Sequence, residues 1–204
     1  MKLEASQIQQ LAEPSLLEPL PSGAWEQLAA YMDQLYRWNA RMNLTAVRDP
    51  AVLARVHIAE CLRAAQTIPA GVHSVLDFGS GAGLPGIPLQ IARPELAVTL
   101  AESQKKKASF LREMVRELRF NTTQVHAGRV EDLPSELHYD LVAMRAVDHM
   151  ERALAAAGPR IGRFCMVLTS RRELQMVTEA FPALDWTSDA IPGSMQRIIL
   201  LGAR

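Results

Sequence analysis

The chain has 204 residues, of which 49% are hydrophobic, and its 22 basic and 22 acidic side chains give no formal net charge at pH 7. This length and composition are typical of one globular domain, or of one domain with an appendage, and they supply enough apolar material for a full core. No apolar run reaches the ~18 residues of a membrane span, the start lacks a secretory signature, and the balanced charge argues mildly against a nucleic-acid partner.

Residues 1–70 are predicted to form an N-terminal helical extension. From Trp25 onward, apolar residues at positions 25, 28, 29, 32, 35 and 36 follow the spacing of one helical face. Asp49 before Pro50 is typical of an N-cap followed by the first helical residue, so another helix is expected from there. The first twenty or so residues are polar and interrupted by proline, which fits either a loose arm or short helices.

Residues 71–204 alternate between strands and helices. Strands are expected in "SVLDF", "AVTLA", "TTQVHA", "DLVAM" and "FCMVLT", and in a final pair that ends with "RIILLGA". Helices are expected near residues 87–92, 105–119, 148–157 and 171–181. This alternation predicts a doubly wound α/β domain with a mostly parallel sheet of seven strands. The last two strands should form an antiparallel hairpin, because the "DAIPGSM" between them is too short for a parallel crossover.

The first of these strands runs into a glycine-rich loop, "LDFGSGAGLPGIPL", which contains Gly79, Gly81, Gly83 and Gly86. In doubly wound sheets, ligands bind at this place, outside the carboxyl ends of the strands. Glycines there allow a ligand to approach the main chain closely. The spacing fits both the dinucleotide-binding loop and the D-x-G-x-G-x-G loop of enzymes that bind S-adenosylmethionine.

Three features favour S-adenosylmethionine over a dinucleotide. Pro85 and Pro88 lack the backbone N–H groups that a pyrophosphate needs at a helix N-terminus. Asp77 suits a cationic ammonium or sulfonium and would repel a pyrophosphate. About 130 residues follow Asp77, which are too few for a dinucleotide domain plus a substrate domain. A purely structural glycine turn is the remaining alternative.

Two further segments point to a nucleoside. Glu102 ends the second strand, 21 residues after Gly81, where a carboxylate accepts hydrogen bonds from two ribose hydroxyls. A solvated glutamate before a turn is the alternative for this residue. The segment "GRVEDL" follows the third strand, and main-chain groups of Val130 and Glu131 are expected to contact the adenine, with Asp132 as a helix-capping residue.

Several segments resemble the bacterial small-subunit (16S) ribosomal RNA guanine-N7 methyltransferases, also called the glucose-inhibited division protein B family. They are "WNARMNLTAVRDP", "HIAECL", "LDFGSGAGLPGIPLQIARPEL", "KKKASFLREMVREL", "GRVEDL" and "YDLVAMRA". The resemblance extends from about Tyr36 to Leu168. It implies a Rossmann-like class I S-adenosylmethionine-dependent methyltransferase fold and methyl transfer to N7 of one guanosine in 16S ribosomal RNA.

The resemblance also implies which residues line the site. These are Gly79, Leu84, Val130, Glu131 and Arg145, with Glu102 on the ribose. Guanine N7 has a free lone pair and carries no proton, so the reaction needs no general base and depends on positioning. Arg145 is the predicted catalytic residue, because it can donate to guanine O6 or to a phosphate. A structural ion pair is its alternative role, and His57 is expected to be a satisfied helix residue rather than a catalytic one.

The predicted RNA contacts are Lys105, Lys106, Lys107, Arg112, Arg41 and Asn43. The first four lie on one basic helix, which fits either a phosphate backbone or a solvated charged face. Residues 43–45 fit equally a turn that packs the extension against the sheet. A second basic group comprises Arg160, Arg163, Arg171 and Arg172. The sequence departs from the family pattern at five positions, which are Val56, Glu60, Cys61, Met144 and Thr169.

The sequence also allows predictions of the localisation, the oligomeric state, metal binding and the class of function. We expect a cytoplasmic monomer without a metal site, with Cys61 and Cys165 as buried free thiols and with 16S ribosomal RNA or the small subunit as partner. The alternatives are a methyltransferase for another RNA site or a small molecule, and a non-catalytic S-adenosylmethionine-binding ribosome-assembly factor. An aromatic content of 5% argues against a small-molecule enclosure, and the intact glycine loop, Glu102 and Arg145 argue against loss of activity.

Overall fold

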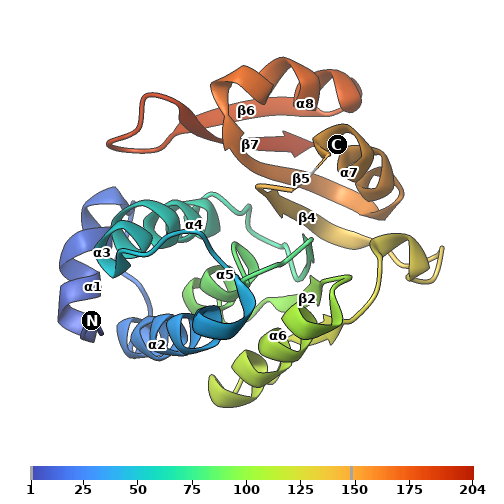
Figure 1. Ribbon diagram of the computed structural model, residues 1–204. Helices are drawn as coiled ribbons and strands as arrows, with labels where there is room; N and C mark the ends of the chain where they lie inside the picture. Colours follow the sequence, from blue (N-terminus) through green and yellow to red (C-terminus); the bar gives the residue numbers. More distant parts are fainter. Residues whose placement is uncertain (1, 148) are drawn as a thin grey trace.

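A computed structural model describes residues 2–147 and 149–204 and shows one twisted sheet with helices on both faces (Figure 1). The strands lie in the order β3-β2-β1-β4-β5-β7-β6. Their bounds are β1 Ser74–Phe78, β2 Ala97–Ala101, β3 Gln124–His126, β4 Tyr139–Arg145, β5 Ile161–Ser170, β6 Asp185–Ala190 and β7 Arg197–Ala203. All neighbours from β3 to β5 are parallel, whereas β7 is antiparallel to both β5 and β6. The predicted seven-stranded sheet with its C-terminal hairpin is confirmed.

The helices follow the predicted order along the chain. They are α1 Ala5–Ala12, α2 Ala24–Met42, α3 Pro50–Val52, α4 Ala59–Gln66, α5 Gly86–Ala92, α6 Lys105–Glu117, α7 Met150–Ala157 and α8 Leu174–Ala180. A π-helical turn, Leu53–Ile58, joins α3 to α4, and four 3₁₀ turns lie at Glu13–Ser15, Val130–Asp132, Gly158–Arg160 and Arg171–Glu173. Asp49 caps α3 as expected, because its carboxylate accepts a hydrogen bond of 2.9 Å from the backbone N–H of Ala51.

Of the two alternatives for the first residues, the structure has the short helices, α1 and the turn after it. Three other helix boundaries differ from the sequence prediction. The helix expected over 105–119 ends at Glu117, because Arg119 has a left-handed φ of +54°. The helix expected from residue 148 begins at Met150, and residue 148 itself lies outside the described residues. The segment 171–181 starts with a 3₁₀ turn before α8.

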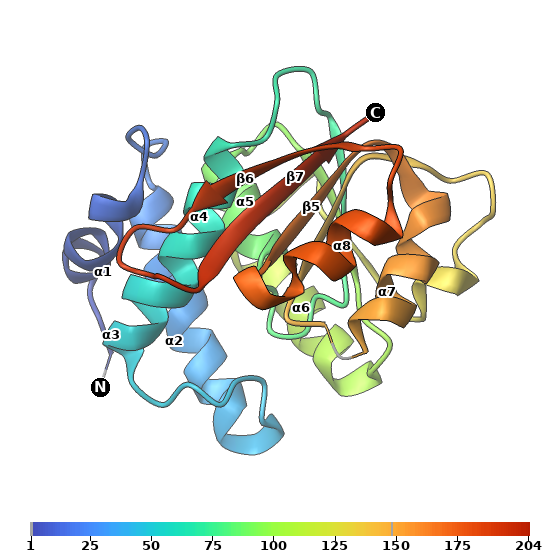
Figure 2. The same ribbon diagram turned by 90° about the horizontal axis from the view of Figure 1, so that it is seen from above.

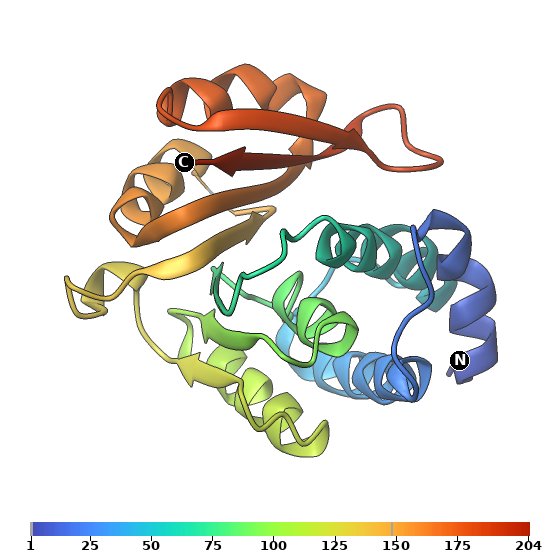
Figure 3. The ribbon, with the colours of Figure 1, turned by 180° about the vertical axis from the view of Figure 1, so that it is seen from behind.

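The two faces of the sheet have separate hydrophobic cores, because successive side chains of a strand point to opposite faces. Val75 belongs to the core cluster that includes residues of α1, α2, α4, α5 and α6, whereas its neighbour Leu76 belongs to the cluster that includes residues of α7 and α8. The view from above shows α7 and α8 together on one side of the strands (Figure 2). From behind, α2, α4, α5 and α6 lie together on the other side, with α1 at the outer end (Figure 3).

The N-terminal helices share their core with the sheet. Leu28 of α2 and Leu62 of α4 belong to the same buried cluster as Val98 of β2. The ring of Trp38 on α2 also meets Phe110 of α6 edge-on, with 5.7 Å between ring centroids. The domain boundary at residue 70 therefore stays a prediction, although it falls between the end of α4 and the start of β1. None of the helices in the described ranges combines the length and apolar character that crossing a bilayer requires.

Candidate cofactor and substrate site

The glycine loop begins where β1 ends and crosses the carboxyl end of the sheet. Gly79, Gly81 and Gly83 have φ values of +71°, +54° and +90°, a backbone region that other residues rarely adopt. The N–H of Ser80 donates to the carbonyl of Ala101 at the end of β2, over 2.9 Å. The loop is therefore bound to the neighbouring strand before it leads into α5.

Two adjoining cavities open at this edge of the sheet, and both are lined by Phe78, Gly79, Ser103 and Val147. The first has a volume of about 330 Å³ and extends towards the segment after β3 and the start of α7. Its further lining residues are Ala101, Gly128, Arg129, Val130, Glu131, His149, Arg152, Ala153 and Ala156.

The second cavity has a volume of about 370 Å³ and extends over the glycine loop towards α6 and the end of β4. Its further lining residues are Leu44, Thr45, Ser80, Gly81, Ala82, Leu84, Glu102, Gln104, Lys107, Arg145 and Ala146. The structure thus brings together most of the site residues that the sequence suggested. Gly79, Val130 and Glu131 line the first cavity, and Gly79, Gly81, Leu84, Glu102 and Arg145 line the second. Asp77 and Gly83 line neither, and their predicted roles as direct ligands stay predictions.

Asp77 lies beneath the glycine loop rather than on the cavity wall. Its side chain is fully buried, and Oδ2 accepts a hydrogen bond of 3.1 Å from the N–H of Gly86, at the start of α5. Oδ1 has no hydrogen-bond partner among the described residues. Burial raises the pKa of Asp77 from 3.8 to about 7, because the charged form is poorly solvated there. Within the structure, Asp77 holds the loop to the first turn of α5.

The raised pKa predicts a pH-dependent stability that Asp77→Asn should remove. The folded chain holds the proton more tightly than the unfolded chain, so this stabilising effect is complete below about pH 4 and is lost as the pH rises through about 7. Asparagine is neutral and keeps an oxygen for Gly86. We therefore expect the variant to gain stability relative to the native chain between pH 5 and pH 8, on the order of a few kcal/mol. Urea denaturation of both proteins at each pH measures this, and a constant difference would contradict it.

Glu102 connects the loop to the helix after β2. Its Oε2 accepts from the N–H of Gly81 over 2.9 Å, and its Oε1 accepts from the N–H of Gln104 over 2.7 Å. The residue is only 6% exposed, so the alternative of a solvated glutamate is wrong. Both oxygens retain lone pairs, since each carboxylate oxygen can accept more than one hydrogen bond. Its contact with ribose hydroxyls stays a prediction.

Tyr31 supports the loop from the helical extension, a role that was not predicted from the sequence. Its hydroxyl, on fully buried Tyr31 of α2, donates a hydrogen bond of 2.7 Å to the carbonyl of Ala82. The sequence offered one indication of this contact, which is a tyrosine hydroxyl on an otherwise apolar helix face. Nothing in the sequence, however, shows which carbonyl such a hydroxyl meets 51 residues away.

Tyr31→Phe should loosen the loop with little change in packing. The variant leaves the Ala82 carbonyl without its donor, which is expected to cost about 1–3 kcal/mol of the free energy of unfolding. Hydrogen exchange at the Gly83 and Leu84 amides should also become faster, because both donate to Ser80 within the same turn. Chemical denaturation and amide exchange test this expectation, and unchanged exchange at both amides would show that the contact does not hold the loop.

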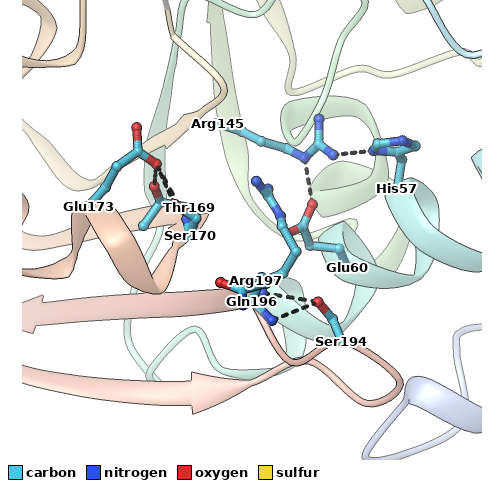
Figure 4. A network of polar contacts seen from close by, with 9 residues as sticks. All are labelled: His57, Glu60, Arg145, Thr169, Ser170, Glu173, Ser194, Gln196 and Arg197. Atoms are coloured by element: carbon cyan, nitrogen blue, oxygen red, sulfur yellow. Dashed lines mark hydrogen bonds and ion pairs between the residues drawn. The ribbon is translucent and has the colours of Figure 1, made fainter.

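Arg145, at the end of β4, lies in a network of charged side chains (Figure 4). Its Nε donates to Oε2 of Glu60 over 2.8 Å, and its Nη2 contacts Nδ1 of His57. The other oxygen of Glu60 accepts from Nε of Arg197 over 2.8 Å. Arg145 therefore has the ion pair that was its alternative role, and it also lines the second cavity.

His57 acts in this network as a neutral partner. Burial and the charge of Arg145 lower the pKa of His57, so the imidazole is uncharged near neutral pH and Nδ1 can accept from the guanidinium. This agrees with the expectation of a satisfied helix residue. His57 lies in the π-helical turn between α3 and α4.

The predicted RNA contacts lie on α6 and at the C-terminal end of α2. Lys105, Lys106 and Arg112 are exposed on α6, whereas Lys107 is half-buried and lines the second cavity. Arg41 is exposed in the last turn of α2, and Asn43 ends that helix with a left-handed φ of +51°. The RNA contacts of these residues stay predictions.

Asn43 is the left-handed C-cap of α2, which fits the alternative interpretation of residues 43–45 as a cap that packs the extension. The buried amide of Asn39 bonds both the N–H and the carbonyl of Thr45, each over 2.9 Å. This pairing holds Leu44 and Thr45 at the edge of the second cavity. An RNA contact of Asn43 would therefore be made from a segment that the Asn39 amide holds in place.

The second basic group does not form one surface. Arg160 is buried, and its guanidinium donates to the carbonyls of Leu133, Pro134 and Leu137, so it holds the loop before β4. Arg163, Arg171 and Arg172 are exposed.

The residues that depart from the family pattern lie in different structural environments. Val56 is 40% exposed, Met144 is buried in the sheet, and the buried hydroxyl of Thr169 donates to Glu173. Cys61 and Cys165 are buried free thiols, as predicted.

Comparison with known proteins identifies relatives of this chain. A family model described as rRNA small subunit methyltransferase G matches residues 24–181. The protein named ribosomal RNA small subunit methyltransferase G from Methylobacillus flagellatus is 47% identical over 127 residues, which cover 62% of this chain and 61% of that protein. The protein of the same name from Xanthomonas oryzae is 43% identical over 131 residues, which cover 64% and 61%. The match thus spans less than two thirds of the length of these relatives.

Solved structures support the fold at lower identity. The mitomycin 7-O-methyltransferase MmcR has a TM-score of 0.62 and 15% identity, over 89% of this chain and 67% of that one. Pyrococcus horikoshii TYW2 in complex with MeSAdo has a TM-score of 0.58 and 16% identity, over 76% and 64%. At these identities the likeness establishes the shared architecture of sheet and helices alone.

Proposed function

Because the chain belongs to the rRNA small subunit methyltransferase G family, we propose that it methylates N7 of a guanosine in 16S ribosomal RNA with S-adenosylmethionine as the methyl donor. The observation that carries this proposal is the family match over residues 24–181, which contains the glycine loop, Glu102 and Arg145. The two relatives above share the name ribosomal RNA small subunit methyltransferase G. The proposed substrate would place the reaction in the cytoplasm.

The residues of the site fit this cofactor. Glu102 presents a carboxylate, already held in position by two backbone N–H groups, to ribose hydroxyls. Val130 and Glu131, on the wall of the first cavity, would contact the adenine. Gly79, which lines both cavities, and Gly81, which lines the second, leave the main chain accessible to a ligand. When bound, S-adenosylmethionine supplies an electrophilic methyl group on a positively charged sulfur.

The chain's own residues would contribute position and charge rather than a base. Guanine N7 attacks with its own lone pair, so no side chain has to accept a proton. Arg145 would donate to guanine O6 or to a phosphate at the second cavity, and it stays charged throughout. Lys107 on the same wall, with exposed Lys105, Lys106 and Arg112 beyond it, would lie along the phosphate backbone. Arg41 and Asn43 would extend this contact from the end of α2.

The test compares 16S ribosomal RNA from cells with and without the gene for this chain. Cleavage or primer-extension mapping of N7-methylguanosine should show one position that loses its modification without the gene and regains it when the gene is restored. An unchanged pattern would end the proposal and leave methylation of another RNA site or a small molecule. Calorimetric titration with S-adenosylmethionine tests the cofactor separately, and absence of transfer despite binding would favour a non-catalytic assembly factor.

A further inference from the structure

The buried carboxylate of Glu60 joins three elements that are far apart in the sequence. It lies on α4, is 1% exposed, and accepts from Arg145 at the end of β4 and from Arg197 at the start of β7 (Figure 4). Each arginine has its own oxygen, with 2.8 Å from Nε of Arg145 to Oε2 and 2.8 Å from Nε of Arg197 to Oε1. A second nitrogen of Arg197, Nη2, lies 2.7 Å from the same Oε1.

The contacts of Arg145 occupy one edge of its guanidinium. Nε is bonded to Glu60 and Nη2 to His57, and these two nitrogens hold the group from one side. Nη1 has no hydrogen-bond partner within residues 2–147 and 149–204, although the side chain is only 10% exposed. The planar fork of an arginine fixes the direction of its remaining donors once one edge is held. The remaining donors of Arg145 are therefore fixed in direction, and the residue lines the second cavity.

We infer that Glu60 is a positioning residue, which acts on the methyl-transfer reaction by holding Arg145 in the orientation that leaves Nη1 for the substrate. This inference rests on the proposed function. Arg197 has a different role, because it balances the charge of Glu60 and connects the network to the C-terminal hairpin. It lines neither cavity.

The two partners of the carboxylate allow a sharp mutational test. Glu60→Leu removes both acceptors and releases Arg145, so the turnover number should fall about 10²-fold, the scale expected when a reacting group is misplaced by about 1 Å. The affinity for S-adenosylmethionine should change less than about threefold. Arg197→Met removes the other partner and leaves the Glu60–Arg145 contact in place. This variant should lose thermal stability while its turnover number stays within about threefold of the native value.

A double variant separates positioning from a general loss of stability. Glu60→Leu with Arg197→Met replaces the buried pair by apolar side chains, which is often neutral or stabilising for the fold. The melting temperature should therefore recover relative to the less stable single variant, while turnover stays as low as in Glu60→Leu. Recovery of turnover together with stability would show that Glu60 has only a structural role, and the inference would be wrong.

An NMR measurement tests the inference without any assay of methyl transfer. The Nε–H of Arg145, identified by its absence in Arg145→Lys, should give a protected signal in the native chain and in Arg197→Met. In Glu60→Leu this signal should shift and exchange rapidly with solvent. Persistence of the native signal in Glu60→Leu would overturn the inference. If the native chain methylates no ribosomal RNA, the proposed function fails, but this signal still decides whether Glu60 orients Arg145.

Discussion

Gly81→Val is expected to abolish S-adenosylmethionine binding while the chain remains folded. Gly81 lines the second cavity with a φ of +54°, and its N–H donates to Glu102. A Cβ at this position would meet only the Gly79 carbonyl within 4 Å, at 3.7 Å, so the side chain would not collide with the core. It would occupy space that the ligand needs, and a β-branched residue strains this backbone region. We expect the dissociation constant to rise more than about 100-fold, which corresponds to about 2.7 kcal/mol.

Gly193→Val provides a matched control for the backbone strain. Gly193 has a φ of +77°, nothing lies within 4 Å of its Cβ position, and it belongs to the turn between β6 and β7. Both variants place valine at a positive φ, but only Gly81 lines a cavity of the site. Calorimetric titration should therefore show native affinity for Gly193→Val, and thermal melting should show similar losses of stability for the two. Equal affinity of both variants would place the ligand away from this loop.

The sequence was sufficient to predict the fold because the relevant signals are local. The apolar spacing from Trp25 gives α2, and alternating strands and helices give the parallel sheet. The short "DAIPGSM" segment requires the antiparallel hairpin, since the chain cannot cross the sheet in so few residues. The glycines at the end of β1 mark backbone conformations that other residues avoid, which located the loop between the two cavities.

The contacts behind the cavity walls could not be predicted, because they depend on how the helical extension docks. The partners Tyr31 and Ala82 are 51 residues apart, and Glu60 and Arg197 are 137 apart. No rule of sequence spacing relates Tyr31 to Ala82, or Glu60 to Arg197. Asp77 was predicted to face the ligand, but a carboxylate at a strand end can equally face the first turn of the next helix, where its Oδ2 accepts from Gly86. Arg160 illustrates the same limit, because composition does not distinguish a solvated arginine from one that caps buried carbonyls.

Arg145→Ala is expected to lower the turnover number by about 10²–10³-fold, the range observed when a donor to the reacting group is removed. Affinity for S-adenosylmethionine should change far less, because Glu102 and the glycine loop keep their own contacts. Glu60 would still pair with Arg197, so the buried carboxylate is not left without a cation. Single-turnover kinetics with small-subunit RNA and calorimetry with the cofactor measure the two effects separately. Equal losses of turnover and of cofactor affinity would show that Arg145 is a cofactor ligand only.

Arg63→Ala is the control that distinguishes this effect from the loss of an ion pair. Arg63 lies on α4, the helix that also carries Glu60. It pairs with Asp189 of β6 through Nε at 2.8 Å and Nη2 at 3.2 Å. Its side chain is 15% exposed, compared with 10% for Arg145, but it lines neither cavity. Because both changes remove an arginine of similar burial from a carboxylate, they should lower the melting temperature similarly. Turnover should fall only in Arg145→Ala, and a comparable fall in Arg63→Ala would attribute the effect to stability rather than to a donor at the reacting base.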